Sequence, residues 1–163
     1  MDYNNNYNNV QHAELSQRFK SGANWFYWIA GLTIVTSLIT FFGGGIRFLF
    51  SLGSTQIIDG IAAALSADVG GAAQVVALAL DLIVTGVFVL FGYLSNQKYL
   101  WAFMLGMVVF LLDGLLSLIF QDWISLLAHG FVLYCLFRGY QAGRELLSLE
   151  KVMAETPQPE LAI

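Results

Sequence analysis

The sequence predicts an all-α membrane protein: a polytopic bundle of four transmembrane helices, with a broken interfacial or re-entrant helical segment between the first two. Three observations predict this class. Of the 163 residues, 58% are hydrophobic and only 11% are charged, whereas a soluble domain has about 25% charged residues. Four apolar runs are long enough to cross a hydrocarbon layer of about 30 Å. Short polar links join the last three runs, which is typical of antiparallel helical hairpins.

The chain divides into three parts. Residues 1–20 are expected to be a disordered or interfacial tail, because the first nine are rich in asparagine and lack a hydrophobic period. Residues 21–143 form the four-helix transmembrane domain. Residues 144–163 are expected to form an amphipathic cytoplasmic helix and a tail, because leucines alternate there with charged residues. The expected spans are 25–43, 72–94, 99–120 and 123–140.

The first span begins with aromatic residues and carries hydroxyls along one face. Trp25 lies at its start, where amphipathic rings prefer the headgroup level. Thr33, Thr36, Ser37 and Thr40 have the spacing of one helical face. Hydroxyls in such a row either bond back to the helix's own carbonyls and tie helices together, or line a polar interior.

Three consecutive glycines end the first span, and the segment after them is too short and too polar to cross a bilayer. Residues 46–52 and 55–65 are expected to be two short helical pieces separated by Gly53 and Ser54. We expect the pair to lie over one end of the bundle. Gln56 and Asp59 then point inward, or face water on an interfacial helix.

Lysine and arginine predict the orientation. Six of the seven lie on one side of the four-span arrangement, and Arg47 lies alone on the other. The positive-inside rule places both termini in the cytoplasm. We therefore expect a multi-pass integral membrane protein, in the inner membrane if the chain is bacterial.

Three of the predicted spans each carry an ionisable residue deep inside: Asp81, Asp113 and His129. At about 1.5 Å per residue, each lies about 9–13 Å below the outer end of its helix, and Ser37 lies at a similar level. An aspartate facing lipid costs about 2.5–3.5 kcal/mol. We therefore expect the three groups to converge in one polar layer, where Asp81 and Asp113 share a proton. The alternative is structural: neutral acids that bond between helices.

This layer is compatible with two kinds of site. One is a proton relay or cation-binding site, and the other is a metal site built from the carboxylates and the imidazole of the layer. Short motifs for a nucleophile elbow, a zinc protease or a phosphate loop are not present in the sequence. The candidate binding or relay residues are Asp81, Asp113, His129, Gln56, Asp59, Ser37 and Thr85, and the candidate metal ligands are Asp81, Asp113 and His129.

Three functions remain open from sequence. The leading one is a small transport or channel-like protein that binds a proton or a cation at the layer. The second is a non-catalytic subunit or scaffold of a membrane complex, and the third is an intramembrane metal-dependent enzyme. Expected partners are the lipid bilayer and either further copies of the chain or another membrane protein. With a net charge of −4 and no basic patch, no nucleic acid is expected.

Overall fold

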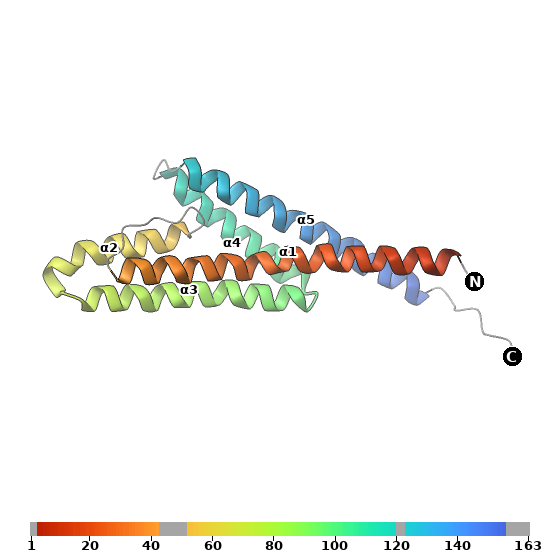
Figure 1. The fold of residues 1–163 in the computed structure, drawn as a ribbon, viewed down its shortest axis with the longest axis horizontal. Coiled ribbons are helices and arrows are strands. Elements are labelled where there is room, and N and C mark those ends of the chain that lie inside the picture. The colour runs from red at the N-terminus through yellow and green to blue at the C-terminus, as the bar shows by residue number, and fades with distance from the viewer. Residues whose placement is uncertain (1–2, 43–51, 120–122, 156–163) are drawn as a thin grey trace.

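The computed structural model describes residues 3–42, 52–119 and 123–155, with the backbone alone for residues 3–5, 56, 66–69 and 117–119. Within these residues the protein is all-helical (Figure 1). The five helices are α1 (Tyr3–Phe41), α2 (Gly53–Val69), α3 (Ala72–Asn96), α4 (Leu100–Ile119) and α5 (Trp123–Glu155).

Helix α1 includes most of the tail that the sequence predicts to be disordered or interfacial. It runs for 39 residues without a break, which corresponds to about 58 Å. Leu15 and Phe19 are buried against the rest of the bundle, so the helix is anchored by packing well before Trp25. Extending a helix that is already nucleated is far easier than starting one, and this accounts for the helical asparagine-rich start.

Helix α2 differs from the predicted pair of short pieces. Gly53 and Ser54 are its first two residues rather than a break between two helices. Residues 46–51 of the expected first piece, with Arg47, lie outside the described part of the chain. Helix α2 continues to Val69, past the expected end of the second piece at residue 65, and the chain reverses at Gly70 with φ +65°.

Helices α3 and α4 form the predicted hairpin, and the turn between them is tight. Lys98 has φ +67° there, in the left-handed region that costs a residue with a Cβ about 1–2 kcal/mol. Its side chain is held by an ion pair, in which Nζ lies 2.6 Å from Glu150 Oε1. Helix α5 joins the predicted fourth span and the C-terminal helix into one continuous helix.

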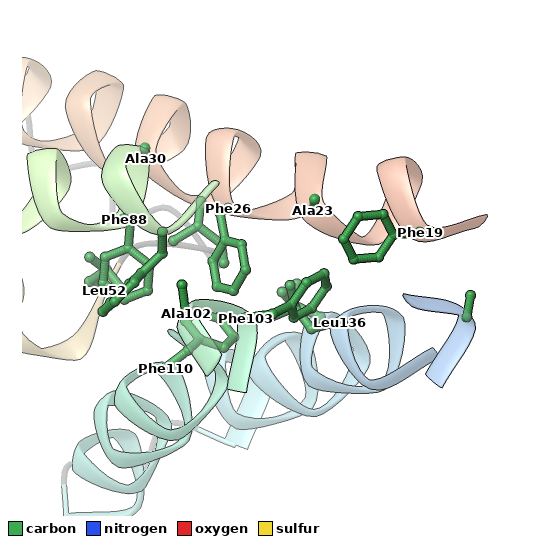
Figure 2. Close-up of a cluster of buried hydrophobic side chains, with 14 of the residues drawn as sticks. Phe19, Ala23, Phe26, Ala30, Leu52, Phe88, Ala102, Phe103, Phe110 and Leu136 are labelled. Carbon is green, nitrogen blue, oxygen red and sulfur yellow. The ribbon is translucent and has the colours of Figure 1, made fainter. Parts of the chain in front are cut away.

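Phenylalanines supply the largest side chains of the core, where they pack between the helices with leucines and alanines (Figure 2). Phe26 from α1 and Phe103 from α4 are in edge contact, with ring centroids 5.4 Å apart. Small residues let the backbones approach these rings: a Cβ on Gly106 would lie 2.7 Å from the Phe26 ring. The buried phenylalanines are Phe19, Phe26, Phe88, Phe91, Phe103 and Phe110.

The first turns of α1 and the last turns of α5 extend past the end of the α3–α4 hairpin and carry both termini at the same end of the molecule (Figure 1). We call residues 3–22 of α1 and 139–155 of α5 the stalk. At its base the two helices meet at Gly22 and Gly139, beside Phe103 of α4. A chain of polar contacts ties it to the hairpin, because Glu150 Oε1 accepts from both Lys98 and His12, whose Nε2 lies 2.8 Å away.

By length and composition, two stretches are long and apolar enough to cross a membrane, within the described residues: Asn6–Phe41 and Ala72–Asn96. Helix α4 contains a shorter apolar stretch, Leu100–Leu116. The four-span topology therefore stays a prediction, while the all-helical class is confirmed.

Candidate functional site

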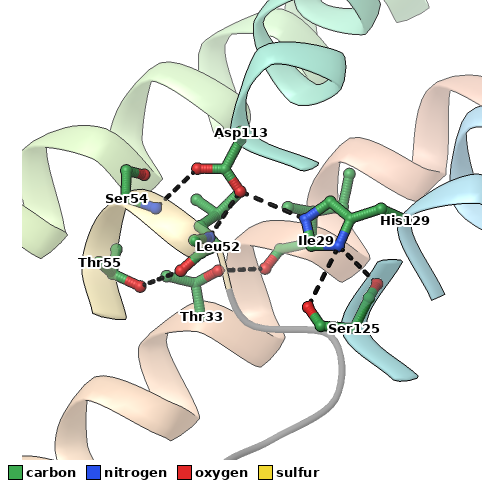
Figure 3. A network of polar contacts seen from close by, with 9 residues as sticks. Ile29, Thr33, Leu52, Ser54, Thr55, Asp113, Ser125 and His129 are labelled. Atoms are coloured by element: carbon green, nitrogen blue, oxygen red, sulfur yellow. Dashed lines mark hydrogen bonds and ion pairs between the residues drawn. The ribbon is translucent and has the colours of Figure 1, made fainter. Parts of the chain in front are cut away.

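Asp113, inside α4, holds the start of α2. The backbone N–H groups of Gly53 and Ser54 donate to its two carboxyl oxygens, at 2.6 and 2.9 Å (Figure 3). These are N–H groups that a helix cannot satisfy itself, and the positive end of the helix dipole favours the carboxylate there. A Cβ on Gly53 would lie 2.9 Å from the backbone oxygen of Asp113, so glycine permits this approach. Asp113 therefore acts as the cap of α2, supplied by another helix.

His129, on α5, approaches the same carboxyl group and is buried with it. Its Nε2 lies 3.3 Å from Asp113 Oδ2, and its Nδ1 lies 2.8 Å from the backbone oxygen of Ser125. Both ring nitrogens thus face acceptors, because Asp113 already accepts two N–H bonds as a carboxylate. We assign the ring as an imidazolium that donates from both nitrogens. Phe110 stacks on it at 4.7 Å between centroids, which suits a cationic ring.

Ser125 completes this group of contacts without forming a catalytic triad. Its hydroxyl oxygen lies 3.4 Å from His129 Nδ1. That nitrogen donates to the Ser125 carbonyl, so it has no lone pair with which to take a proton from the hydroxyl. The Ser125, His129 and Asp113 side chains are therefore a structural network in this state, which we call the capping cluster together with the Gly53 and Ser54 amides.

A second polar cluster lies at the contact between α1, α2 and α3. Asp81 on α3 is 1% exposed, and its Oδ2 accepts a hydrogen bond of 2.7 Å from the Ser37 hydroxyl on α1. The half-buried Asp59 carboxyl on α2 is within hydrogen-bonding reach of the Asp81 carboxyl and of the Thr40 hydroxyl. We call Asp59 and Asp81 the acid pair.

The acid pair has room in its hydrogen bonding for a proton or a cation. Asp81 Oδ1 receives no hydrogen bond from a donor among the described residues. Two ionised carboxylates are both acceptors, so the contact between Asp59 and Asp81 becomes a hydrogen bond only when one of them is protonated. Two neighbouring carboxyl groups commonly share one proton, because their like charges repel when both are ionised.

The structure thus brings the predicted residues together in two groups rather than in one layer. Asp113 and His129 meet, and Asp81 and Ser37 meet, but Asp81 and Asp113 form no hydrogen bond or ion pair with each other among the described contacts. Helix α2 contributes to both groups, and Ser54 and Asp59 are separated along it by about 7–8 Å at its usual rise. The carboxyl group beside Asp81 is therefore that of Asp59 on α2, and not that of Asp113 as expected from the sequence.

The remaining predicted residues have different outcomes. Thr85 is buried one turn from Asp81, and its hydroxyl has no hydrogen-bond partner in the part of the chain that is described. The side chain of Gln56 lies outside the described residues. Within those residues, no three histidine, cysteine, aspartate or glutamate side chains are close enough to hold a metal ion. The candidate ligands Asp81, Asp113 and His129 are not brought together.

Two of the four hydroxyls on the first span serve the helix itself. Thr33 and Thr36 donate to the carbonyls of Ile29 and Leu32, at 2.9 and 3.0 Å. Ser37 and Thr40 face the acid pair. Bonding within α1 by Thr33 and Thr36, and between α1 and α3 by Ser37, is the first of the two uses that the sequence left open.

Sequence reasoning identified Asp113 as a buried acid but missed its role as a cap. Ser54 and Thr55 are the residue types that usually cap a helix from within, yet Thr55 Oγ1 donates to the carbonyl of Leu52 at 2.8 Å. The signal available in the sequence was Gly53 at the first position of α2, because a glycine there leaves room for a capping carboxyl group from another helix.

A small cavity of about 10 Å³ lies beside His129, between α1, α4 and α5. It is mostly apolar, with Trp25, Trp28 and Phe110 among its walls, and its volume suits about one water molecule. The chain matches no protein-family model, no curated protein and no solved structure.

Proposed function

We propose that the protein is a four-span membrane protein whose acid pair binds and releases a proton, as part of a small proton- or cation-conducting system. The outer faces of the helices support the membrane topology. Large apolar side chains are exposed along α4 and the first half of α5 as well as along α1 and α3, which suits contact with lipid on all four. Examples are Ile34, Val35, Leu82, Ile83, Leu111, Leu112, Leu127 and Phe131.

The charge distribution supports an orientation with both termini in the cytoplasm. The stalk, the α3–α4 turn and the adjoining turns of α5 carry Arg18, Lys20, Lys98, Arg138, Arg144 and Lys151. The stalk and the α3–α4 turn lie at the end of the molecule where α1 begins and α5 ends (Figure 1). Segments rich in lysine and arginine stay on the cytoplasmic side.

The observation that carries the proposed activity is the placement of Asp81. It is almost fully buried, and it lies in a helix long and apolar enough to cross a membrane. One of its oxygens, beside a second carboxyl, receives no hydrogen bond from the part of the chain that the structure describes. Ionisable groups buried at membrane depth are usually on proton or ion pathways. The Ser37 and Thr40 hydroxyls supply further oxygens, so a small cation is the second ligand that suits the pair.

The test is proton flux into liposomes that contain the purified protein and a pH-sensitive dye. The wild type should carry flux under an imposed potential, and Asp81→Asn and Asp59→Asn should each abolish it. Glu14→Gln is the matched control, because it removes an exposed carboxylate of the stalk and should leave flux unchanged. Equal flux in all four proteins, or no flux from a correctly folded wild type, contradicts the proposal.

A second candidate function is favoured by the small size of the cavity beside His129. This cavity has room for about one water molecule, so it offers no open path for a proton or a cation through the bundle in this state. Under this second reading the protein is a non-catalytic subunit of a membrane complex, and the acid pair fastens α2 to α1 and α3. Absence of flux from every variant, with Asp81→Asn unfolding more easily than wild type, would favour it.

A further inference from the structure

A groove of about 370 Å³ lies between α1 and α5 at the foot of the stalk. Its walls are half polar and half apolar in character. Leu15, Trp25, Tyr134 and Ala142 contribute apolar and aromatic side chains to the walls. The charged side chains that line the groove include Arg18, Arg138 and Glu145. None of the hydrogen bonds and ion pairs described above involves Arg18, Arg138 or Glu145.

The groove lies at the level of the membrane surface in the four-span topology. Asn96, the last residue of α3, is 3.5 Å from Asn24 of α1 through its side-chain nitrogen. The end of the hairpin is therefore level with Asn24, and the groove runs from Trp25 outward to Leu15, over about 15 Å of helix. Trp25 and Tyr134 are the residue types that gather at the headgroup level.

The arginines of the groove are available for a ligand. The Arg138 guanidinium lies over the Tyr134 ring, 5.9 Å from its centroid, and makes no ion pair among the described residues. Arg18 has only a long contact of 3.8 Å with Glu14, and both side chains are exposed, so this pair contributes little. Guanidinium groups bind phosphate through two parallel N–H bonds.

Glu145 lines the same groove, and its carboxylate limits which phosphate-bearing ligand the groove can bind. A carboxylate repels a ligand that carries only negative charge, but it accepts hydrogen bonds from a primary ammonium. Two guanidiniums and one carboxylate therefore complement a headgroup that carries a phosphate and an amine. The apolar walls suit the glycerol and the first methylenes of the chains.

We propose that this groove binds one aminophospholipid of the surrounding bilayer, with its phosphate at Arg18 and Arg138 and its ammonium at Glu145. The proposal rests on the four-span topology, because that topology places the groove at the headgroup level. It does not depend on the acid pair, which lies far from the stalk at the α1–α2–α3 contact.

The test uses the full chain in detergent, mixed with equimolar phosphatidylethanolamine, phosphatidylglycerol and phosphatidylcholine, and native mass spectrometry to count retained lipid. The wild type should retain one phosphatidylethanolamine in preference to the other two. Arg138→Gln should lower that retention about tenfold. Arg144→Gln, a neighbouring exposed arginine that does not line the groove, is the matched control and should retain lipid as wild type does.

Glu145→Gln tests the headgroup directly, because it should shift the preference from phosphatidylethanolamine to phosphatidylglycerol. Equal retention by the Arg138→Gln and Arg144→Gln variants overturns the proposal, as does equal retention of phosphatidylcholine. Displacement of the lipid by inorganic phosphate at millimolar concentration also overturns it, because a free anion would then be the ligand.

Flotation of each variant with liposomes separates the two proposals. A wild type that inserts but retains no lipid contradicts the groove assignment alone. A wild type that does not float contradicts the four-span topology and the groove assignment with it.

Discussion

The crossing of α1 and α5 predicts that an alanine at Gly139 destabilises the protein. A Cβ at this position would lie 2.6 Å from the Gly22 Cα, and one at Gly22 would lie 2.5 Å from the Gly139 Cα. Real Cβ atoms almost never approach another heavy atom within 3.0 Å. The obstacle on each side is backbone, so no side-chain rotation relieves the contact and the two helices must separate.

The size of the destabilisation follows from comparing the free energy of unfolding of Gly139→Ala with that of Gly130→Ala, on the same helix. Gly130 is exposed, and a Cβ there meets nothing within 4 Å. Alanine favours the helix over glycine by about 1 kcal/mol at either position. That gain cancels between the two variants, so their difference in free energy of unfolding is the packing cost alone, about 1–3 kcal/mol.

The assay is denaturant-induced unfolding in one detergent, followed by helical circular dichroism. Gly130→Ala should unfold at a higher denaturant concentration than the wild type, and Gly139→Ala at a lower concentration than Gly130→Ala. Equal midpoints for the two alanine variants would refute the close crossing of α1 and α5.

Three further predictions concern the polar contacts. Ser37→Ala removes the hydroxyl that donates to buried Asp81, and it should lower the free energy of unfolding by about 1–3 kcal/mol in the same denaturant assay; an unchanged midpoint would contradict this contact. Asp113→Ala leaves the His129 imidazolium unpaired and α2 without its cap, so it should cost about 3–5 kcal/mol and speed amide exchange at the start of α2; unchanged exchange there would contradict the capping role. Hydrogen bonds from a lysine and a histidine hold the pKa of Glu150 below its ordinary value, so its stabilisation is complete above about pH 4.3 and is lost as pH falls through the lowered pKa. Amide protection of the stalk should therefore fall in that acid range more steeply in wild type than in Glu150→Gln, and identical pH profiles would argue against the contact.

The helical elements after residue 72 were predictable because their signals are local. Apolar runs and short polar links specify a hairpin of α3 and α4 and a turn into α5. The structure has α3 and α4 within two residues of the predicted ends, whereas α5 begins at the predicted Trp123 and continues past 140 to Glu155. The start of the chain was less predictable. Asparagine composition favours disorder, but the burial of Leu15 and Phe19 against α5 depends on residues more than a hundred positions away.

The burial of the candidate site residues was predictable, but their lateral arrangement was not. Asp81, Asp113 and His129 are all buried, as their place in apolar runs indicates, while their common depth in a membrane stays a prediction from the rise of a helix. Which groups meet depends on α2, whose start lies against Asp113 and whose Asp59 lies against Asp81. Its position follows from a cap supplied by α4, which is a contact between distant segments and leaves no periodic signal in sequence.

The most direct test of the central claim is infrared spectroscopy of the reconstituted protein, which detects the carbonyl band of a protonated carboxyl group. If Asp59 and Asp81 share one proton, the wild type shows such a band at neutral pH. Asn substitution at either position should remove or shift the band, and Glu14→Gln should leave it intact. A wild type without the band, or a band unchanged in both the Asp59→Asn and Asp81→Asn variants, would contradict a shared proton in the acid pair.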